Sequence, residues 1–180
     1  PAASLVFDGD TLSGTSPALP DAGVAGIAVL RVGADLVLVE LDNPSVRRVP
    51  LTGLDPTRPM AELRFERAPA QKLDGGSADG STIAERVLDG AAVLLAFEQV
   101  GGATRALELA RDYALERKAF GRQIGSFQAL KHKMADMFTR NELARAHAYY
   151  GAWALSSDAP ELPAAAAAAR AAGDPRTRGR

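Results

Sequence analysis

The hydrophobic pattern of this 180-residue chain changes its period at one short polar segment. Before residue 74 the apolar residues form short runs rich in β-branched side chains, and after residue 81 they recur every three or four positions. A period of two is typical of strands and a period near 3.6 is typical of helices. The segment 74–81, Asp-Gly-Gly-Ser-Ala-Asp-Gly-Ser, has the composition of a linker. The sequence therefore predicts an α+β protein with a β-domain at 1–73 and a helical portion at 82–172.

The β-domain is predicted to be an antiparallel sheet of about four or five short strands. The runs 25–32 and 36–41 are separated by Gly33-Ala34-Asp35, a length that suits a hairpin loop. The run 61–66 alternates apolar and charged residues, as a strand with one solvated face does. Because proline cannot donate a backbone hydrogen bond, the prolines between 17 and 69 are expected at connections or sheet edges.

Two long helices joined by a short turn are predicted after the linker. The first begins at Thr82, which has capping-box spacing to Glu85, and runs to about Lys118, roughly 37 residues. The second runs from Ser126, a suitable N-cap, to about Leu155. Because a short turn forces such helices to lie antiparallel, residues 82–172 are expected to form part of an up-and-down bundle.

One face of each predicted helix is apolar, and the glycines Gly101 and Gly102 interrupt the first helix. Glycine costs up to ~1 kcal/mol relative to alanine inside a helix, so this pair predicts close approach by a neighbouring helix. A third helix is predicted from Glu161, and the tail 173–180 is expected to be disordered. The apolar area of these two faces is larger than the two helices can bury against each other. Further helices, from this chain or another, are therefore expected to cover the rest. The two faces are Val93, Phe97, Val100, Thr104, Leu107, Ala110 and Ala114, and Phe127, Leu130, Met134, Met137, Ala144 and Ala148, the latter interrupted by Asn141.

The composition excludes several classes of function. There is no cysteine, which excludes disulfides, thiolate metal sites and cysteine nucleophiles. The net charge of −1 gives no global field that attracts nucleic acid or an acidic membrane. No apolar run approaches the ~20 residues that cross a bilayer, and no signal-peptide pattern is found at the N-terminus, which lacks an initiator methionine. We therefore expect a cytoplasmic protein that binds neither nucleic acid nor membrane.

The turn between the two long helices, 115–128, concentrates cations, glycines and aromatic residues. Arg117, Lys118 and Arg122 can reach phosphate or carboxylate oxygens, and the glycines in the turn let the backbone bend. These residue types suit an anion-binding site. They also suit a solvated helix C-terminus, where basic residues offset the negative end of the helix dipole.

Other catalytic patterns are absent from the sequence. It has no dinucleotide-binding Gly-x-Gly-x-x-Gly after a strand, no phosphate-binding Gly-x-x-x-x-Gly-Lys and no Gly-x-Ser-x-Gly elbow. A di-iron bundle needs Glu-x-x-His on its helices, and the only histidines, His132 and His147, do not have ligand spacing. They are expected at the surface or at its boundary with the core, and no metal site is predicted.

The turn and its flanking helices resemble the acyl-CoA dehydrogenase family. The similarity lies in Tyr113-Ala-Leu-Glu-Arg-Lys-Ala-Phe-Gly-Arg-Gln-Ile-Gly-Ser-Phe-Gln128, in Lys131-His-Lys-Met-Ala-Asp-Met137 and in Glu98-Gln-Val-Gly-Gly-Ala103. The resemblance implies a family fold of an N-terminal helical domain, a middle β-domain and a C-terminal four-helix bundle. Residues 1–73 are similar to the middle domain and 82–172 to the first bundle helices, so about half of the family's length is present.

The resemblance also implies a cofactor, a substrate and an oligomer. Family members hold FAD and an acyl-CoA thioester, and act in fatty acid or steroid catabolism. Arg117 matches the arginine that contacts the flavin pyrophosphate, with Lys118 and Ala119 beside it, Phe120 matches the phenylalanine of the same loop, and Phe127 and Gln128 match the pair near the adenosine. In the family these groups reach the FAD of a neighbouring subunit, which implies a homo- or hetero-oligomer, a dimer or a tetramer.

Two departures from the family pattern bear on catalysis. Where the family carries Trp-x-Ser/Thr against the flavin ring, this chain has Ala18-Leu19-Pro20. The base that removes the α-proton lies in most members beyond this chain's end. In one branch it lies at a position near Ala91-Ala92, and Glu85 is too far upstream to replace it. No catalytic residue is therefore assigned.

Three functions remain open at this stage. The first is FAD-dependent α,β-dehydrogenation of an acyl-CoA. The second is a non-catalytic partner subunit or truncated fragment that completes the FAD site of a neighbour, as in family members that form mixed tetramers on steroid-derived thioesters. The third is a free-standing anion-binding helical module.

Overall fold

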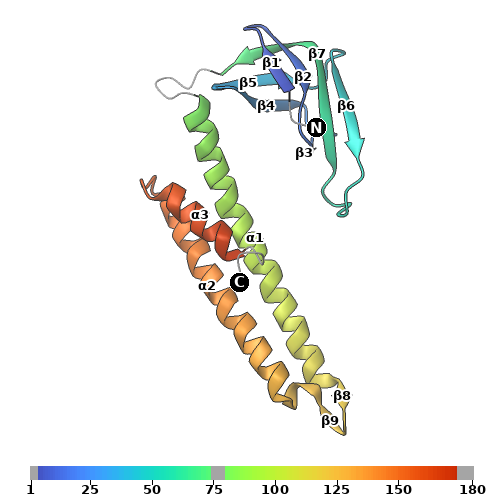
Figure 1. Cartoon of the computed structure of the whole chain (residues 1–180), viewed down its shortest axis with the longest axis vertical. Coiled ribbons are helices and arrows are strands. Elements are labelled where there is room, and N and C mark those ends of the chain that lie inside the picture. The colour runs from blue at the N-terminus through green and yellow to red at the C-terminus, as the bar shows by residue number, and fades with distance from the viewer. Residues whose placement is uncertain (1–3, 74–79, 174–180) are drawn as a thin grey trace. The chain divides into compact units, whose positions relative to one another are not determined.

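The computed structural model describes residues 4–73 and 80–173 (Figure 1). The chain divides into two compact units, Pro1–Glu85 and Arg86–Arg180. All strands of the large sheet lie in the first unit, and the second is built from helices and one small hairpin. This arrangement confirms the predicted α+β class. The predicted linker and the predicted tail lie largely outside the described residues.

The sheet has seven strands within the described residues, all paired antiparallel. The three predicted strands are confirmed, but the predicted total of four or five is too low. The four strands that the pattern missed are short, and two of them contain proline. The strands are β1 Ser4–Phe7, β2 Thr11–Thr15, β3 Leu19–Pro20, β4 Ile27–Val32, β5 Asp35–Glu40, β6 Val46–Leu51 and β7 Met60–Lys72.

Strand β7 organises this unit because it pairs with β2, β3, β5 and β6. A bulge at Arg67, whose φ is +53°, divides it into a part that pairs with β6 and a part that pairs with β5. The prolines of β3 and β6 lie on strands whose sole partner in the described sheet is β7, as expected of edges. Pro69 contradicts the expectation because it lies inside β7. Pro69 lies between the part of β7 that pairs with β6 and the part that pairs with β5. Neither of these strands therefore needs a hydrogen bond from the N–H that proline lacks.

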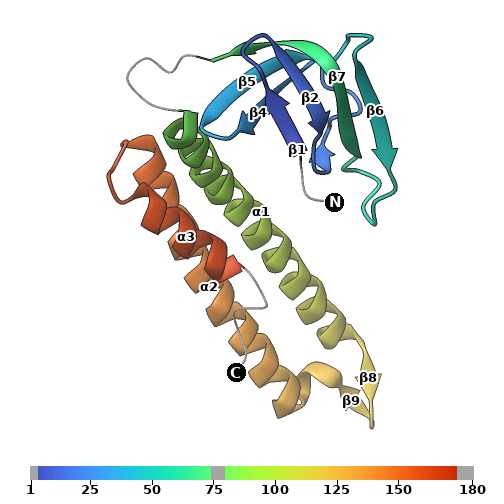
Figure 2. The same cartoon turned by 45° about the horizontal axis from the view of Figure 1, so that its top comes forward.

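The helical unit contains α1 Gly80–Glu116, α2 Gln128–Ser156 and α3 Leu162–Gly173. Figures 1 and 2 show α1 and α2 side by side and antiparallel, which confirms the predicted bundle arrangement. Both predicted N-caps are wrong. Helix α1 begins two residues before Thr82, and the N-cap of α2 is Phe127, which makes no side-chain cap bond.

Helix α3 packs against the halves of α1 and α2 that are far from their connecting turn. Val93 of α1 and Ala154 of α2 are fully buried in one cluster with Leu162 of α3. Gly101 and Gly102 are exposed, and no atom lies within 4 Å of where their Cβ atoms would be. The predicted close helix approach is therefore not made by the described part of this chain.

Helix α1 keeps many apolar side chains exposed. By length and composition it could cross a membrane, a property that the core helices of soluble proteins share, and 17% of its most apolar window is buried. The exposed side chains include Leu88, Leu94 and Leu95, at 63%, 68% and 49% exposure. These side chains form apolar surface that the other described residues leave uncovered.

Candidate functional site

The turn that joins α1 to α2 is a β-hairpin followed by one helical turn. Strand β8, Lys118–Ala119, pairs with β9, Arg122–Gln123, and the 3₁₀ turn η1 covers Ile124–Ser126. The Ile124 N–H donates to the Arg117 carbonyl at 2.8 Å, which continues the ladder by one pair. Because directly paired residues share a face, Arg117, Ala119 and Arg122 lie on one face of the hairpin and Lys118 on the other.

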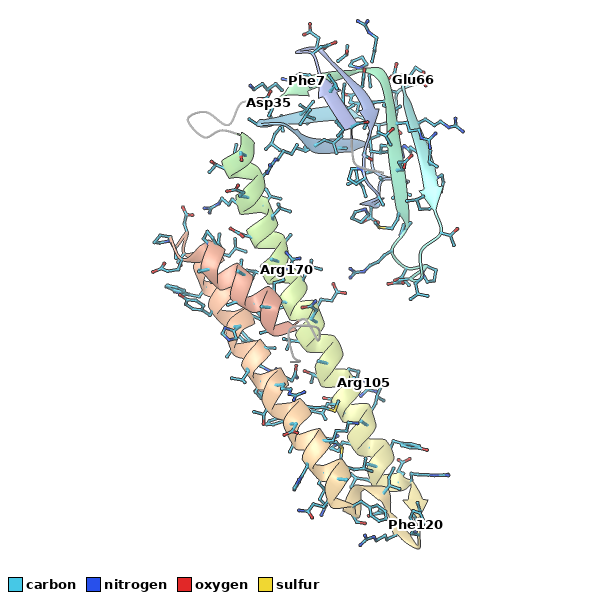
Figure 3. The ribbon with its side chains drawn as sticks, in the orientation of Figure 1. Phe7, Asp35, Glu66, Arg105, Phe120 and Arg170 are labelled. Carbon is cyan, nitrogen blue, oxygen red and sulfur yellow. The ribbon has the colours of Figure 1, made fainter. Side chains whose placement is uncertain are left out.

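The tip of the hairpin is a two-residue loop with both residues in the left-handed region. Phe120 has φ +52° and Gly121 has φ +76°, the combination that a type I′ hairpin turn requires. Glycine adopts this conformation freely, whereas a bulky residue there is strained. The strained residue is also strongly exposed, since Phe120 is 95% exposed at the tip of the hairpin (Figure 3).

Phe127 connects the hairpin tip to the start of α2. Its ring meets Phe120 edge-on, with ring centroids 6.2 Å apart, and the guanidinium carbon of Arg122 lies 4.1 Å from its centroid. The sequence did not indicate this stacking. It arises because the 3₁₀ turn returns Phe127 to the level of the hairpin, and Ser126 Oγ fixes that turn by donating to the Gln123 carbonyl at 2.6 Å.

Gly125 allows the hairpin to lie against the end of α1. A Cβ at this position would lie 2.9 Å from the carbonyl oxygen of Ala114, which is itself buried. Any other residue would push the 3₁₀ turn away from the helix. The hairpin is thus held against the end of α1 by backbone contact.

The cations of the hairpin have no carboxylate partner among residues 4–73 and 80–173. Among the ion pairs of the described residues, none involves Arg117, Lys118 or Arg122, and all three are exposed. Gln128 is exposed as well, and its Nε2 lies 3.4 Å from Nε2 of His132. Guanidinium groups suit diphosphate oxygens, an exposed aromatic ring suits a nucleobase, and a carboxamide can donate and accept. This donor set fits a dinucleotide such as FAD.

The structure brings together all six residues that were predicted to bind the cofactor. Arg117, Lys118, Ala119, Phe120, Phe127 and Gln128 lie within the hairpin or at the start of α2. Both histidines are exposed, as expected. The solvated-terminus alternative is not tested by this arrangement. The last turn of α1 contains no basic residue, but Arg117 follows the helix directly and its N–H donates to the Tyr113 carbonyl at 2.9 Å.

The structure also shows where the positions lie that depart from the family pattern. Ala18 is exposed and directly precedes β3, where Pro20 contributes neither a hydroxyl nor an N–H. On α1, Ala91 is exposed and Ala92 packs against the buried cluster around Val93. Glu85 is exposed in the first turns of the same helix. Neither Ala91 nor Ala92 carries a titratable side chain.

Comparison with known proteins indicates the same family as the residues of the hairpin. Residues 78–175 match the acyl-CoA dehydrogenase C-terminal domain. The acyl-CoA dehydrogenase FadE34 of Mycobacterium tuberculosis is 36% identical over 164 residues, which are 91% of this chain and 22% of FadE34. The acyl-CoA dehydrogenase IpdE2 of the same organism is 46% identical over 97 residues, which are 54% of this chain and 27% of IpdE2.

The fold is likewise similar to solved structures of this family. A variant of the Tcur3481–Tcur3483 steroid ACAD superimposes with a TM-score of 0.78 and 30% identity, covering 96% of this chain and 47% of that chain. The chain therefore belongs to the acyl-CoA dehydrogenase family. It spans about a quarter of the curated relatives just named and about half of the solved one.

Proposed function

We propose that the protein containing this chain is an FAD-dependent acyl-CoA dehydrogenase, and that the β8–β9 hairpin binds the diphosphate and adenosine of FAD. The observation that carries the proposal is a set of exposed cations, without an ion-pair partner in the described part of the chain, beside an exposed aromatic ring in a chain of this family. When bound, FAD accepts the hydride that an acyl-CoA thioester loses from its β-carbon. The residues described here bind and orient the cofactor.

Each hairpin residue has a distinct part in this proposal. Arg117 lies where α1 ends, and its guanidinium can bind two phosphate oxygens at once. Ala119 lies on the same face and is small enough to leave the phosphates room. Phe120 offers an exposed ring to the adenine, backed by Phe127, and Gln128 offers its carboxamide at the start of α2.

The site is proposed to serve a neighbouring subunit, in a dimer or a tetramer. This follows from the family resemblance and is supported by the hairpin's exposure at the end of the long α1–α2 pair. The Tcur3481–Tcur3483 relative is named as a steroid ACAD, which favours a bulky, ring-containing acyl group as the substrate of this protein as well.

A second function is favoured by Ala18 and Pro20. These residues leave the place of the family's tryptophan and hydroxyl without either group, and no base is found at Ala91 or Ala92. In this alternative the chain belongs to a non-catalytic subunit that contributes Arg117 and Gln128 to the FAD of a different subunit. The double name of the Tcur3481–Tcur3483 relative fits such a mixed assembly.

A visible absorption spectrum separates the two functions. If the purified protein carries flavin that acyl-CoA bleaches, it is a self-sufficient dehydrogenase and the partner alternative is wrong. If the protein is colourless alone and acquires flavin only with a second subunit, the partner alternative holds. Failure to bind flavin under either condition contradicts the proposed function.

A further inference from the structure

We propose that Arg122 is a second diphosphate-binding guanidinium, held in position by the ring of Phe127. This inference rests on the proposed function, because it assigns a further residue to the same FAD site. Arg122 lies outside the set of residues that the family resemblance assigns to the cofactor. The structure gives it three properties that a binding residue needs: an unpaired charge, a fixed orientation and the right face of the hairpin.

The charge of Arg122 is available to a ligand. No ion pair of the described residues includes Arg122, and its side chain is exposed. The guanidinium carbon lies over the Phe127 ring, 4.1 Å from its centroid. A guanidinium carries five N–H donors, so contact with one ring leaves donors that can bind phosphate oxygens.

The stacking also restricts where the guanidinium can be. An arginine side chain loses substantial rotamer entropy when a ligand immobilises it, and a group that is already oriented loses less. Phe127 is half-buried, held between Arg122 and Phe120 by the 3₁₀ turn. The ring therefore serves as a support that orients Arg122 before the ligand arrives.

The hairpin register places Arg122 on the same face as Arg117. Ala119 pairs directly with Arg122, and the bond from Ile124 to Arg117 adds the next pair of the ladder. That face also carries Ala119, which is paired with Arg122, and Ile124, which is paired with Arg117. Two guanidiniums on one face of the hairpin match the two adjacent phosphates of a dinucleotide.

The test measures nucleotide affinity in the assembled apoprotein that contains this chain, with FAD, ADP and adenosine as probes. Arg122→Gln is expected to weaken FAD and ADP binding about 10-fold, to leave adenosine binding unchanged and to lower the salt dependence of ADP binding. Phe127→Leu keeps the charge but removes the support, so a smaller loss of about 3-fold is expected for FAD and ADP. Arg170→Gln, at an exposed position of α3, is the charge-matched control and should bind as the wild type does.

Two results would overturn this inference. One is wild-type ADP affinity in Arg122→Gln, and the other is an equal loss for adenosine and ADP, which indicates a loosened hairpin instead of a lost phosphate contact. Arg117→Gln separates this failure from that of the proposed function. If Arg117→Gln weakens FAD binding and Arg122→Gln does not, only the role of Arg122 is wrong. If neither substitution weakens FAD binding, the proposed function of the hairpin is wrong.

Discussion

Asn141 of α2 donates a 2.7 Å hydrogen bond from Nδ2 to the hydroxyl oxygen of Thr104 on α1. Arg145 donates to the same oxygen at 3.2 Å, and the hydroxyl in turn donates to the Val100 carbonyl at 2.7 Å. Asn141 is 6% exposed, and its Oδ1 has no partner within the described residues. Asn141, which interrupts the apolar face of α2, thus has a hydrogen-bond partner on α1 for its amide nitrogen but none within the described residues for its amide oxygen.

This pair gives a prediction on stability. Thr104→Val should destabilise the helical unit by about 1–3 kcal/mol, because it leaves the buried Asn141 amide without an acceptor. The double variant Thr104→Val/Asn141→Leu should recover most of that loss, since both polar groups are then gone. Urea unfolding of the single and double variants measures the coupling. Additive losses would show that the two side chains do not depend on each other.

The exposed glycines of α1 give a second prediction. Gly101→Ala should stabilise the helical unit by up to about 1 kcal/mol, because alanine is the better helix former and no atom lies near the new methyl group. Gly102→Ala should stabilise the unit in the same way, and the midpoint temperature of thermal unfolding measures both effects. A loss of stability, or of assembly, would instead reveal a neighbouring helix that needs the glycine surface.

Phe120 gives a prediction in which stability and binding change in opposite directions. Phe120→Gly should relieve the left-handed strain at φ +52° and stabilise the protein by up to ~1 kcal/mol, while it weakens FAD binding by removing the exposed ring. Gly121→Ala is the matched variant and should lose stability, because its φ of +76° then carries a side chain. If Phe120→Gly retains wild-type FAD affinity, the ring does not contact the cofactor.

Asp8 gives a prediction on pH dependence. Hydrogen bonds from the backbone N–H and the hydroxyl of Thr11, with a third from the Asp10 N–H, hold the pKa of Asp8 below its usual 3.8. Because the folded-state pKa is the lower one, the stabilisation is present above pH 3.8 and is lost as the pH falls through the folded-state pKa. The stability of Asp8→Asn should therefore fall less between neutral and acidic pH than that of the wild type. A Thr11→Val variant should show an intermediate dependence, and an unchanged wild-type profile in Asp8→Asn would contradict this role.

The sequence predicted the helices and the composition of the site because both depend on local patterns. The 37-residue length of α1 and the antiparallel course of α2 follow from periodicity and one short turn. The six residues predicted to bind the cofactor lie in one short segment, and for that reason alone they are close to one another in space. Their contact with FAD, by contrast, remains a prediction.

Long-range pairing decided what the sequence could not show. Strand β7 continues past Pro69 because β6 ends and β5 begins to pair on either side of it, which no local pattern of β7 reveals. Gly14, with φ +115°, permits β1 to approach so closely that a Cβ would overlap the Ser4 carbonyl. The stacking of Arg122 on Phe127 likewise depends on the 3₁₀ turn between them, although Gly121 after Phe120 was a local signal of the tight hairpin.

The affinity of Arg117→Gln for FAD tests the central claim most directly. Equilibrium titration of the assembled apoprotein with FAD should show at least a 10-fold loss relative to both the wild type and the Arg170→Gln control, since a charge-assisted contact contributes about 1.5–3 kcal/mol. Unchanged FAD affinity in a folded Arg117→Gln protein would contradict the assignment of the β8–β9 hairpin as a cofactor-binding site.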